Sequence, residues 1–210
     1  MGGLFIALEG PDGSGKSTIL ELIGDYLEKK GIEYIKTREP GGTPIGEEIR
    51  DIILDEKNVN MGAETEALLY AASRSQHIHE KIIPALKEGK LVLCDRFVLS
   101  SLAYQGIGRG LGIERVKSIN DFALRGIYPD LILFFHIDPE VSLKRKTEKL
   151  GGDRLEQEGN DFHKKVYDGY MKLIDLYPDK IKVIDASQSV EEVLSQSIGE
   201  IEKLLISEEG

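Results

Sequence analysis

Short runs of mostly apolar residues recur along the chain, and the intervals between them are long enough for a helix. The runs cover residues 4–8, 34–37, 91–94, 131–137 and 181–184. Runs of this length with few polar residues are typical of strands that are buried on both faces of a parallel sheet.

Between these runs, apolar residues repeat every three or four positions, which is the spacing of one face of a helix. Ile19, Ile23, Tyr26 and Leu27 follow this spacing, and so do the apolar residues of the segment 190–205. Buried strands that alternate with amphipathic helices predict an α/β fold, in which a five-stranded parallel sheet is flanked by helices on both faces.

The segment 144–159 breaks the pattern, because it has basic residues, a pair of glycines and few apolar positions. In a protein that handles phosphates, such a segment between helices is expected to act as a short lid. A solvated loop is the alternative.

Length and composition predict a single domain that spans residues 1–210. The formal net charge of −10 argues against binding to a nucleic-acid polymer, which requires clustered cations. No basic leader or long apolar segment is visible, so a cytoplasmic protein without a membrane span is expected. The single cysteine, Cys94, lies in an apolar run and is expected to be a buried, inert thiol.

A glycine-rich segment follows the first apolar run and precedes a helical pattern. It fits the motif G-x-x-x-x-G-K-[ST], whose backbone N–H groups surround phosphates. Lys16 is expected to reach the β- and γ-phosphate oxygens, and the Ser17 hydroxyl is expected to bind Mg²⁺. The predicted binding residues for the phosphate donor are Gly10, Pro11, Asp12, Gly13, Ser14, Gly15, Lys16, Ser17 and Thr18.

A carboxylate and a guanidinium follow the third apolar run, where Asp95 is followed by Arg96. The carboxyl end of a parallel strand is where ligands bind in such sheets, so Asp95 is expected to complete the metal site with Ser17. A structural ion pair between the two residues is the alternative.

A phosphate-binding loop alone does not distinguish a kinase from a nucleotide-operated switch or a larger ATPase. The switch class normally carries an Asn-Lys-x-Asp element, and the sequence contains no Asn-Lys pair. A small-molecule kinase is favoured by arginines outside the loop, because two anionic phosphates must be brought together. These arginines are Arg38, Arg50, Arg74, Arg96 and Arg154.

Several segments together resemble the thymidylate kinase family, within the nucleoside monophosphate kinases. The similar segments are residues 37–43 with Arg50, the helix that carries Tyr70 and Arg74, residues 95–97 with 100–106, and residues 153–156. The resemblance covers nearly the whole chain. It implies a P-loop nucleoside monophosphate kinase fold of bacterial type that transfers the γ-phosphoryl group of ATP to thymidylate (dTMP), giving dTDP. It also implies Mg²⁺ as cofactor and a homodimer.

The same resemblance assigns the residues around the acceptor phosphate. Asp12 is expected near the sugar 3′-hydroxyl, Arg50 and Arg96 are expected to hold the phosphate, and Arg38 is expected to lie nearby. The implied catalytic set is Asp12, Lys16, Arg96 and Arg154.

For the base, the resemblance places Tyr70 against the pyrimidine ring and Arg74 at a ring carbonyl. Ser101 and Gln105 are expected to add polar contacts, and Tyr104 is expected to crowd the sugar 2′ position. From the residues alone, a core position for Tyr70 and a surface charge for Arg74 are the favoured interpretations. A uridylate or cytidylate kinase remains the alternative function, because one methyl group discriminates weakly.

Two further expectations concern the backbone and the lid. The Glu39–Pro40 bond is a candidate cis peptide. The loop before Lys16 carries no cation, and the resemblance implies that in such family members the lid supplies one, with Arg154 as the first candidate. The other lid cations are Lys144, Arg145, Lys146 and Lys149.

Overall fold

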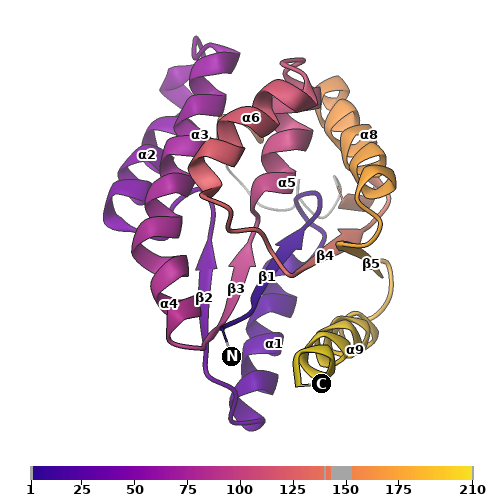
Figure 1. Ribbon diagram of the computed structural model, residues 1–210. Helices are drawn as coiled ribbons and strands as arrows, with labels where there is room; N and C mark the ends of the chain where they lie inside the picture. Colours follow the sequence, from indigo (N-terminus) through magenta and orange to yellow (C-terminus); the bar gives the residue numbers. More distant parts are fainter. Residues whose placement is uncertain (1, 140, 143–152, 210) are drawn as a thin grey trace.

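The protein folds around one parallel β-sheet, as the computed structural model shows for residues 2–139, 141–142 and 153–209 (Figure 1). The strand order is β2-β3-β1-β4-β5, and every neighbouring pair is parallel. The strands are β1 (Phe5–Glu9), β2 (Tyr34–Arg38), β3 (Leu91–Asp95), β4 (Leu131–His136) and β5 (Ile181–Asp185). The five predicted strands are therefore confirmed to within a residue or so at their ends.

Helices follow most strands and cover both faces of the sheet. They are α1 (Lys16–Lys29), α2 (Pro44–Leu54), α3 (Ala63–His77), α4 (Ile83–Lys87), α5 (Val98–Ser101), α6 (Ile113–Leu124), α8 (Asn160–Leu176) and α9 (Val190–Glu209). A short 3₁₀ helix, η1, covers Glu56–Asn58. Two π-helical segments, η2 (Ile78–Ile82) and η3 (Leu102–Gly108), continue α3 and α5. Such segments are frequent at functional sites.

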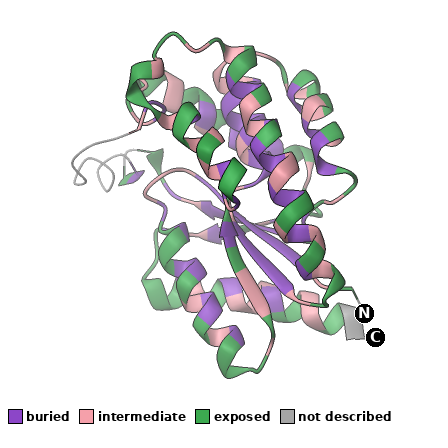
Figure 2. Cartoon of the chain, turned by 90° about the vertical axis from the view of Figure 1, so that its left-hand side faces the viewer, coloured by how far each residue is buried: buried purple, intermediate pink, exposed green. Residues whose placement is uncertain are grey.

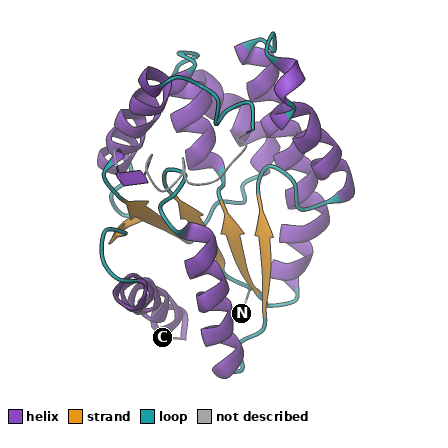
Figure 3. Ribbon diagram, turned by 180° about the vertical axis from the view of Figure 1, so that it is seen from behind, coloured by secondary structure: helices purple, strands orange, loops and turns teal. Residues whose placement is uncertain are grey.

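The alternation of side chains along β1 divides the core into two layers. Phe5 and Ala7 point to one face, where they join a cluster with Tyr170 of α8. Ile6 and Leu8 point to the other face, which α1 and α9 cover. Figure 3 shows α1 and the C-terminal helix α9 in front of the strands on that second face. Figure 2 shows that burial is concentrated in the strands and in the helix faces turned toward them.

The carboxyl ends of β1, β2 and β3 meet at one edge of the sheet. Leu8 is paired with Asp95 in the β1–β3 register, and Arg38 is paired with Asp95 in the β2–β3 register. The glycine-rich loop, the end of β2 and the end of β3 therefore lie side by side, because parallel strands bring their carboxyl ends to the same edge. Among the described residues, no helix is both long enough and apolar enough to cross a membrane.

Candidate active site

The glycine-rich loop connects β1 to α1 in a conformation that side chains would obstruct. Gly10, Gly13 and Gly15 have φ angles of 137°, 79° and 88°, all in the region that favours glycine. A Cβ atom at Gly10 would lie 2.7 Å from the carbonyl oxygen of Phe135 on β4. The loop therefore packs tightly against the neighbouring strand, and α1 begins at Lys16 with its N-terminus facing the loop.

Lys16 is buried inside this loop, with 6% of its surface exposed. Its Nζ atom donates hydrogen bonds to the carbonyl oxygens of Gly10 at 2.9 Å and Pro11 at 2.8 Å. Burial, together with the positive charge of Arg96, lowers the pKa of Lys16 to about 8, although nearby carboxylates oppose both effects. A phosphate oxygen would compensate this poorly solvated charge.

The predicted metal residues are in direct contact. The Ser17 hydroxyl donates to Asp95 Oδ2 at 2.9 Å, while Asp95 Oδ1 is buried and has no hydrogen-bond partner among the described residues. A hydroxyl and a carboxylate with one unpaired oxygen fit Mg²⁺, which prefers oxygen ligands. In the described part of the chain no three acidic, His or Cys side chains form a metal cluster, so phosphate and water oxygens would complete the coordination.

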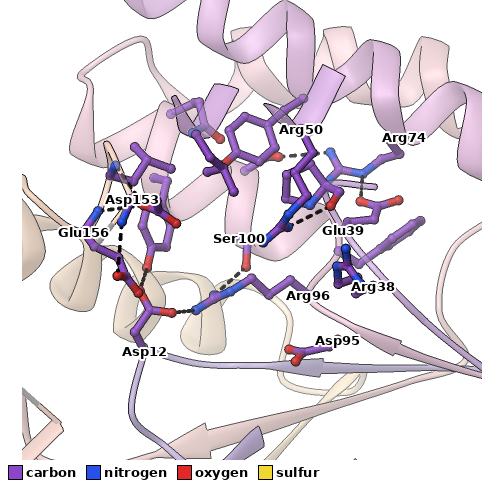
Figure 4. Close-up of a pocket in the computed structure, with 18 residues that line it drawn as sticks. Asp12, Arg38, Glu39, Arg50, Arg74, Asp95, Arg96, Ser100, Asp153 and Glu156 are labelled. Carbon is purple, nitrogen blue, oxygen red and sulfur yellow. Dashed lines mark hydrogen bonds and ion pairs between the residues drawn. The ribbon is translucent and has the colours of Figure 1, made fainter. Parts of the chain in front are cut away.

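A pocket opens beside the loop, between the carboxyl ends of the strands and the helices α2, α3 and η3 (Figure 4). The structure brings all the predicted acceptor residues together in its walls, although their contacts with a substrate remain a prediction. The lining includes Arg38, Arg50, Tyr70, Arg74, Arg96, Ser101, Tyr104 and Gln105.

Arg96 lies at the floor of this pocket in a strained backbone conformation. Its φ of 66° is one of two positive values at non-glycine residues in the described chain, and such outliers are frequent at functional sites. Its guanidinium donates to the Ser100 hydroxyl at 3.1 Å and the Tyr170 hydroxyl at 3.2 Å, and forms an ion pair with Asp12. Figure 4 shows Arg96 extending across the pocket toward Asp12. The alternative of a structural ion pair with Asp95 is wrong, since Arg96 is paired with Asp12 instead.

The other two phosphate-side arginines enter from β2 and α2. Arg50 donates to the carbonyl oxygen of Pro40 at 2.9 Å, and Arg38 forms an ion pair with Glu47 at 2.8 Å. The Glu39–Pro40 bond is cis, as predicted.

Arg74 is the most buried cation of the pocket, with 1% of its surface exposed, so the alternative of a surface charge is wrong. Its Nε atom donates to Glu39 Oε2 at 2.7 Å, and its Nη1 atom donates to Ser101 Oγ at 3.0 Å. Asn120 of α6 accepts a further hydrogen bond from Nη1. Glu39 also contacts His77 Nδ1 at 3.0 Å. The guanidinium is therefore held in one orientation at the pocket wall.

Arg154 lies away from the pocket lining. Its guanidinium donates to the carbonyl oxygen of Ile53 at 2.8 Å and to Glu66 Oε2 at 2.6 Å. These bonds would have to break before Arg154 could reach a phosphoryl group, so that role stays a prediction. Of the predicted lid, Asp153, Leu155 and Glu156 line the pocket, and the cations at 144, 145, 146 and 149 lie outside the described residues.

Several residues that organise the site were missed by sequence reasoning. Glu39 and Ser100 lie inside the segments that carried the resemblance, but their acidic or hydroxyl side chains gave no sign of their partners. Tyr170 and Asn120 lie on helices outside the motifs, and only the packing of those helices brings them to the pocket residues. Glu66 lies one turn before Tyr70 on α3, but its partner Gln105 comes from another element.

Comparisons with known proteins agree with this geometry. The family model described as "Thymidylate kinase" matches residues 8–197. The thymidylate kinase of Finegoldia magna is 60% identical over 195 residues, which cover 93% of this chain and 96% of that protein. The thymidylate kinase of Clostridium novyi is 57% identical over 94% of this chain and 97% of its own. The crystal structure of thymidylate kinase from Ehrlichia chaffeensis has a TM-score of 0.77 at 30% identity, covering 96% of this chain and 99% of that one.

Proposed function

The chain belongs to the thymidylate kinase family, and from this premise we propose how its residues divide the work of the reaction. The enzyme transfers the γ-phosphoryl group of ATP to thymidylate, giving dTDP. The main observation in support of these roles is a pocket that is rich in arginine and opens directly beside the phosphate-binding loop.

On the donor side, the loop holds the phosphates of ATP. Its backbone N–H groups and the N-terminus of α1 face the β-phosphate, and Lys16 contacts the β- and γ-phosphates. Ser17 and Asp95 hold Mg²⁺, which neutralises charge on the phosphates when it is bound. The unpaired oxygen of Asp95 supports this assignment.

On the acceptor side, Arg50 and Arg96 hold the phosphate of thymidylate, and Arg38 adds positive charge at the rim. Because the transition state spreads negative charge over the transferred group, these side chains act by positioning and by charge stabilisation. Asp12 orients Arg96 and lies where the sugar 3′-hydroxyl would approach. This role is supported by the Asp12–Arg96 ion pair at the pocket floor.

The far end of the pocket receives the base. Tyr70 lies against the ring, Arg74 donates to a ring carbonyl, and Ser101 and Gln105 complete the polar surface. Tyr104 crowds the 2′ position, which favours deoxyribose over ribose by steric exclusion. The burial of Arg74, Ser101 and Gln105 at one wall supports this placement.

A panel of acceptors tests the whole proposal. In a coupled assay of ADP release with Mg-ATP, we expect the highest kcat/KM with thymidylate, a lower value with deoxyuridylate and the lowest values with ribonucleotides. Higher activity on uridylate or cytidylate would contradict the base and sugar assignments, while no transfer to any monophosphate would contradict the kinase reaction itself.

We also propose that two copies of the chain pair through the helices α2, α3 and α6, of which α3 packs against both of the others. Each presents a large exposed apolar side chain: Ile52, Leu68 and Phe122, the last with 89% of its surface exposed. Such residues are costly on a free surface when they cluster. Light scattering is expected to give the mass of two chains, and Phe122→Asp is expected to give the mass of one. A single-chain mass for the unaltered protein would contradict this pairing.

The proposed location of the enzyme is the cytoplasm, which membership of the family supports. Fractionation of cells tests this, and recovery of the protein with membranes would contradict it.

A further inference from the structure

Glu66 is a fully buried carboxylate on α3 that receives hydrogen bonds from three side chains. Its Oε1 atom accepts from Gln105 Nε2 at 2.9 Å and from Arg109 Nε at 3.2 Å. Its Oε2 atom accepts from Arg109 Nη2 at 3.0 Å and from Arg154 Nη2 at 2.6 Å. The carboxylate therefore joins η3, which carries Gln105 and is followed directly by Arg109, to Arg154 in the described part of the predicted lid.

The partners of Glu66 keep it ionised. Burial raises its pKa, but hydrogen bonds from Arg109, Gln105 and Arg154 outweigh burial and hold the pKa below its usual value. An ionised carboxylate can only accept hydrogen bonds. The Gln105 carboxamide must therefore turn its NH₂ group toward Glu66 and its oxygen away.

The Gln105 side-chain oxygen is left without a hydrogen-bond partner in the wall of the pocket where the base is proposed to bind. Gln105 lines the pocket with 1% of its surface exposed, and its Oε1 atom is buried without a hydrogen-bond partner in the part of the chain that the structure describes. A buried acceptor without a partner is costly, so a donor from a bound ligand would be strongly favoured there. The neighbouring Ser101 hydroxyl already accepts from Arg74.

The bases of pyrimidine nucleotides differ at the atom that could satisfy this oxygen. Thymine and uracil carry one ring N–H group, at N3 between two carbonyls, whereas cytosine carries a lone pair at N3. Next to an arginine that donates to a ring carbonyl, an acceptor suits the N3–H group and repels the cytosine lone pair.

We propose that Glu66 is a positioning residue, which fixes the Gln105 carboxamide with its oxygen toward N3–H of the acceptor base and so selects a pyrimidinedione over cytosine. The inference rests on the proposed placement of the base at Arg74 and Gln105. Glu66 does not touch the substrate and acts through Gln105.

Glu66→Gln tests this, because the network dictates how the new amide must turn. Two cationic arginines donate to the Oε2 position, whereas the Oε1 position receives only one, Arg109 Nε at 3.2 Å, beside Gln105. The amide oxygen will therefore occupy the Oε2 position and the NH₂ group will face Gln105. Gln105 must then turn over and present its NH₂ group to the pocket. With the full chain, calorimetry is expected to show dTMP binding weakened about tenfold and dCMP binding unchanged or tightened, since one buried hydrogen bond is exchanged for a repulsion. A variant that only loosened the structure would weaken both ligands.

Glu158→Gln is the matched control. Glu158 pairs with the same Arg109, at 2.5 Å from Nη1, and Gln105 is not among its hydrogen-bond partners. It is expected to leave the ratio of dTMP to dCMP affinity unchanged. Arg74 is unaltered in both variants, so its preference for a ring carbonyl contributes equally to the two affinity ratios that are compared.

Gln105→Ala separates this inference from the proposed function. It is expected to weaken dTMP binding, and adding Glu66→Gln to it is expected to change the affinity ratio no further, because the two residues act as one unit. If Gln105→Ala weakens dTMP but Glu66→Gln lowers both affinities equally, the role of Glu66 is wrong and the base pocket stands. If Gln105→Ala has no effect on dTMP, the base placement fails and the role of Glu66 with it, although phosphoryl transfer would persist.

Discussion

Lys16→Ala is expected to lower kcat at saturating Mg-ATP and dTMP by about 10²–10³-fold or more, since removal of one preorganised charge-stabilising donor has effects of this size. Lys16 Nζ lies inside the loop on the carbonyl oxygens of Gly10 and Pro11, and in the proposed complex it contacts the phosphates between which the bond breaks. The thermal unfolding midpoint is expected to change little. Burial lowers the pKa of Lys16, which means that the charged form of this side chain is destabilised in the free protein and that its removal costs little stability. The coupled assay and calorimetric unfolding measure the two quantities.

Lys16→Arg is the control for charge, and pH provides a second readout. In the unaltered enzyme, kcat/KM for ATP is expected to fall as the pH rises through about 8, where Lys16 of the free enzyme loses its proton. The residual activity of Lys16→Arg is expected to lack this fall, because a guanidinium does not titrate in that range. Retained turnover in Lys16→Ala, or the same alkaline fall in Lys16→Arg, would contradict the placement of Lys16 at the phosphates.

Arg74→Ala is expected to lower the free energy of unfolding by about 3–5 kcal/mol, because it removes one partner of a buried ion pair and leaves the other charge uncompensated. That other charge is Glu39, which then keeps its hydrogen bond with the His77 ring at 3.0 Å. The same substitution is expected to raise KM for dTMP while KM for ATP stays close to its original value. Denaturant unfolding and the two KM values measure these effects.

A pair of further variants identifies the cause of the lost stability. Adding Glu39→Gln to Arg74→Ala is expected to restore part of it, since the uncompensated charge is then removed. Arg38→Ala is the matched surface comparison, because Arg38 pairs with Glu47 while about half of its side chain is exposed, and its loss is expected to cost at most about 1 kcal/mol. An Arg74→Ala protein as stable as the original, or one that lost ATP and dTMP binding equally, would contradict the position of Arg74.

Local patterns were sufficient for the strands and for the donor site. Each predicted run became a strand, and the inner strands β1, β3 and β4 are buried almost throughout, because a run with few polar side chains must be buried on both faces of a sheet. The glycine-rich motif was sufficient to predict the conformation of the loop, since the loop requires positive φ angles at Gly10, Gly13 and Gly15. The pairing of Ser17 with Asp95 followed from the meeting of parallel strand ends.

The partners of the charged side chains could not be read in this way. Arg154, expected at the transferring phosphoryl group, is bound instead to Glu66, 88 positions away in the sequence. Arg74, which from the residues alone could have been a surface charge, is the most deeply buried cation of the pocket. Periodicity indicates which face of a helix is buried, but not which charge another helix brings to that face.

The resemblance to thymidylate kinases, and not the local patterns, pointed to the residues that line the pocket beside the glycine-rich loop. The sequence by itself determined the α/β sheet, the glycine-rich loop and the proximity of Ser17 to Asp95. These features depend on local periodicity, on glycine stereochemistry and on motifs in which the spacing of the residues itself places the phosphate-binding groups. Only the tertiary structure decided the orientation of Arg74, the ion pair of Asp12 with Arg96, and the binding of Gln105 and Arg154 to Glu66. The physical reason is that a buried polar group must find a partner wherever packing provides one, and packing brings together residues that no short stretch of sequence relates.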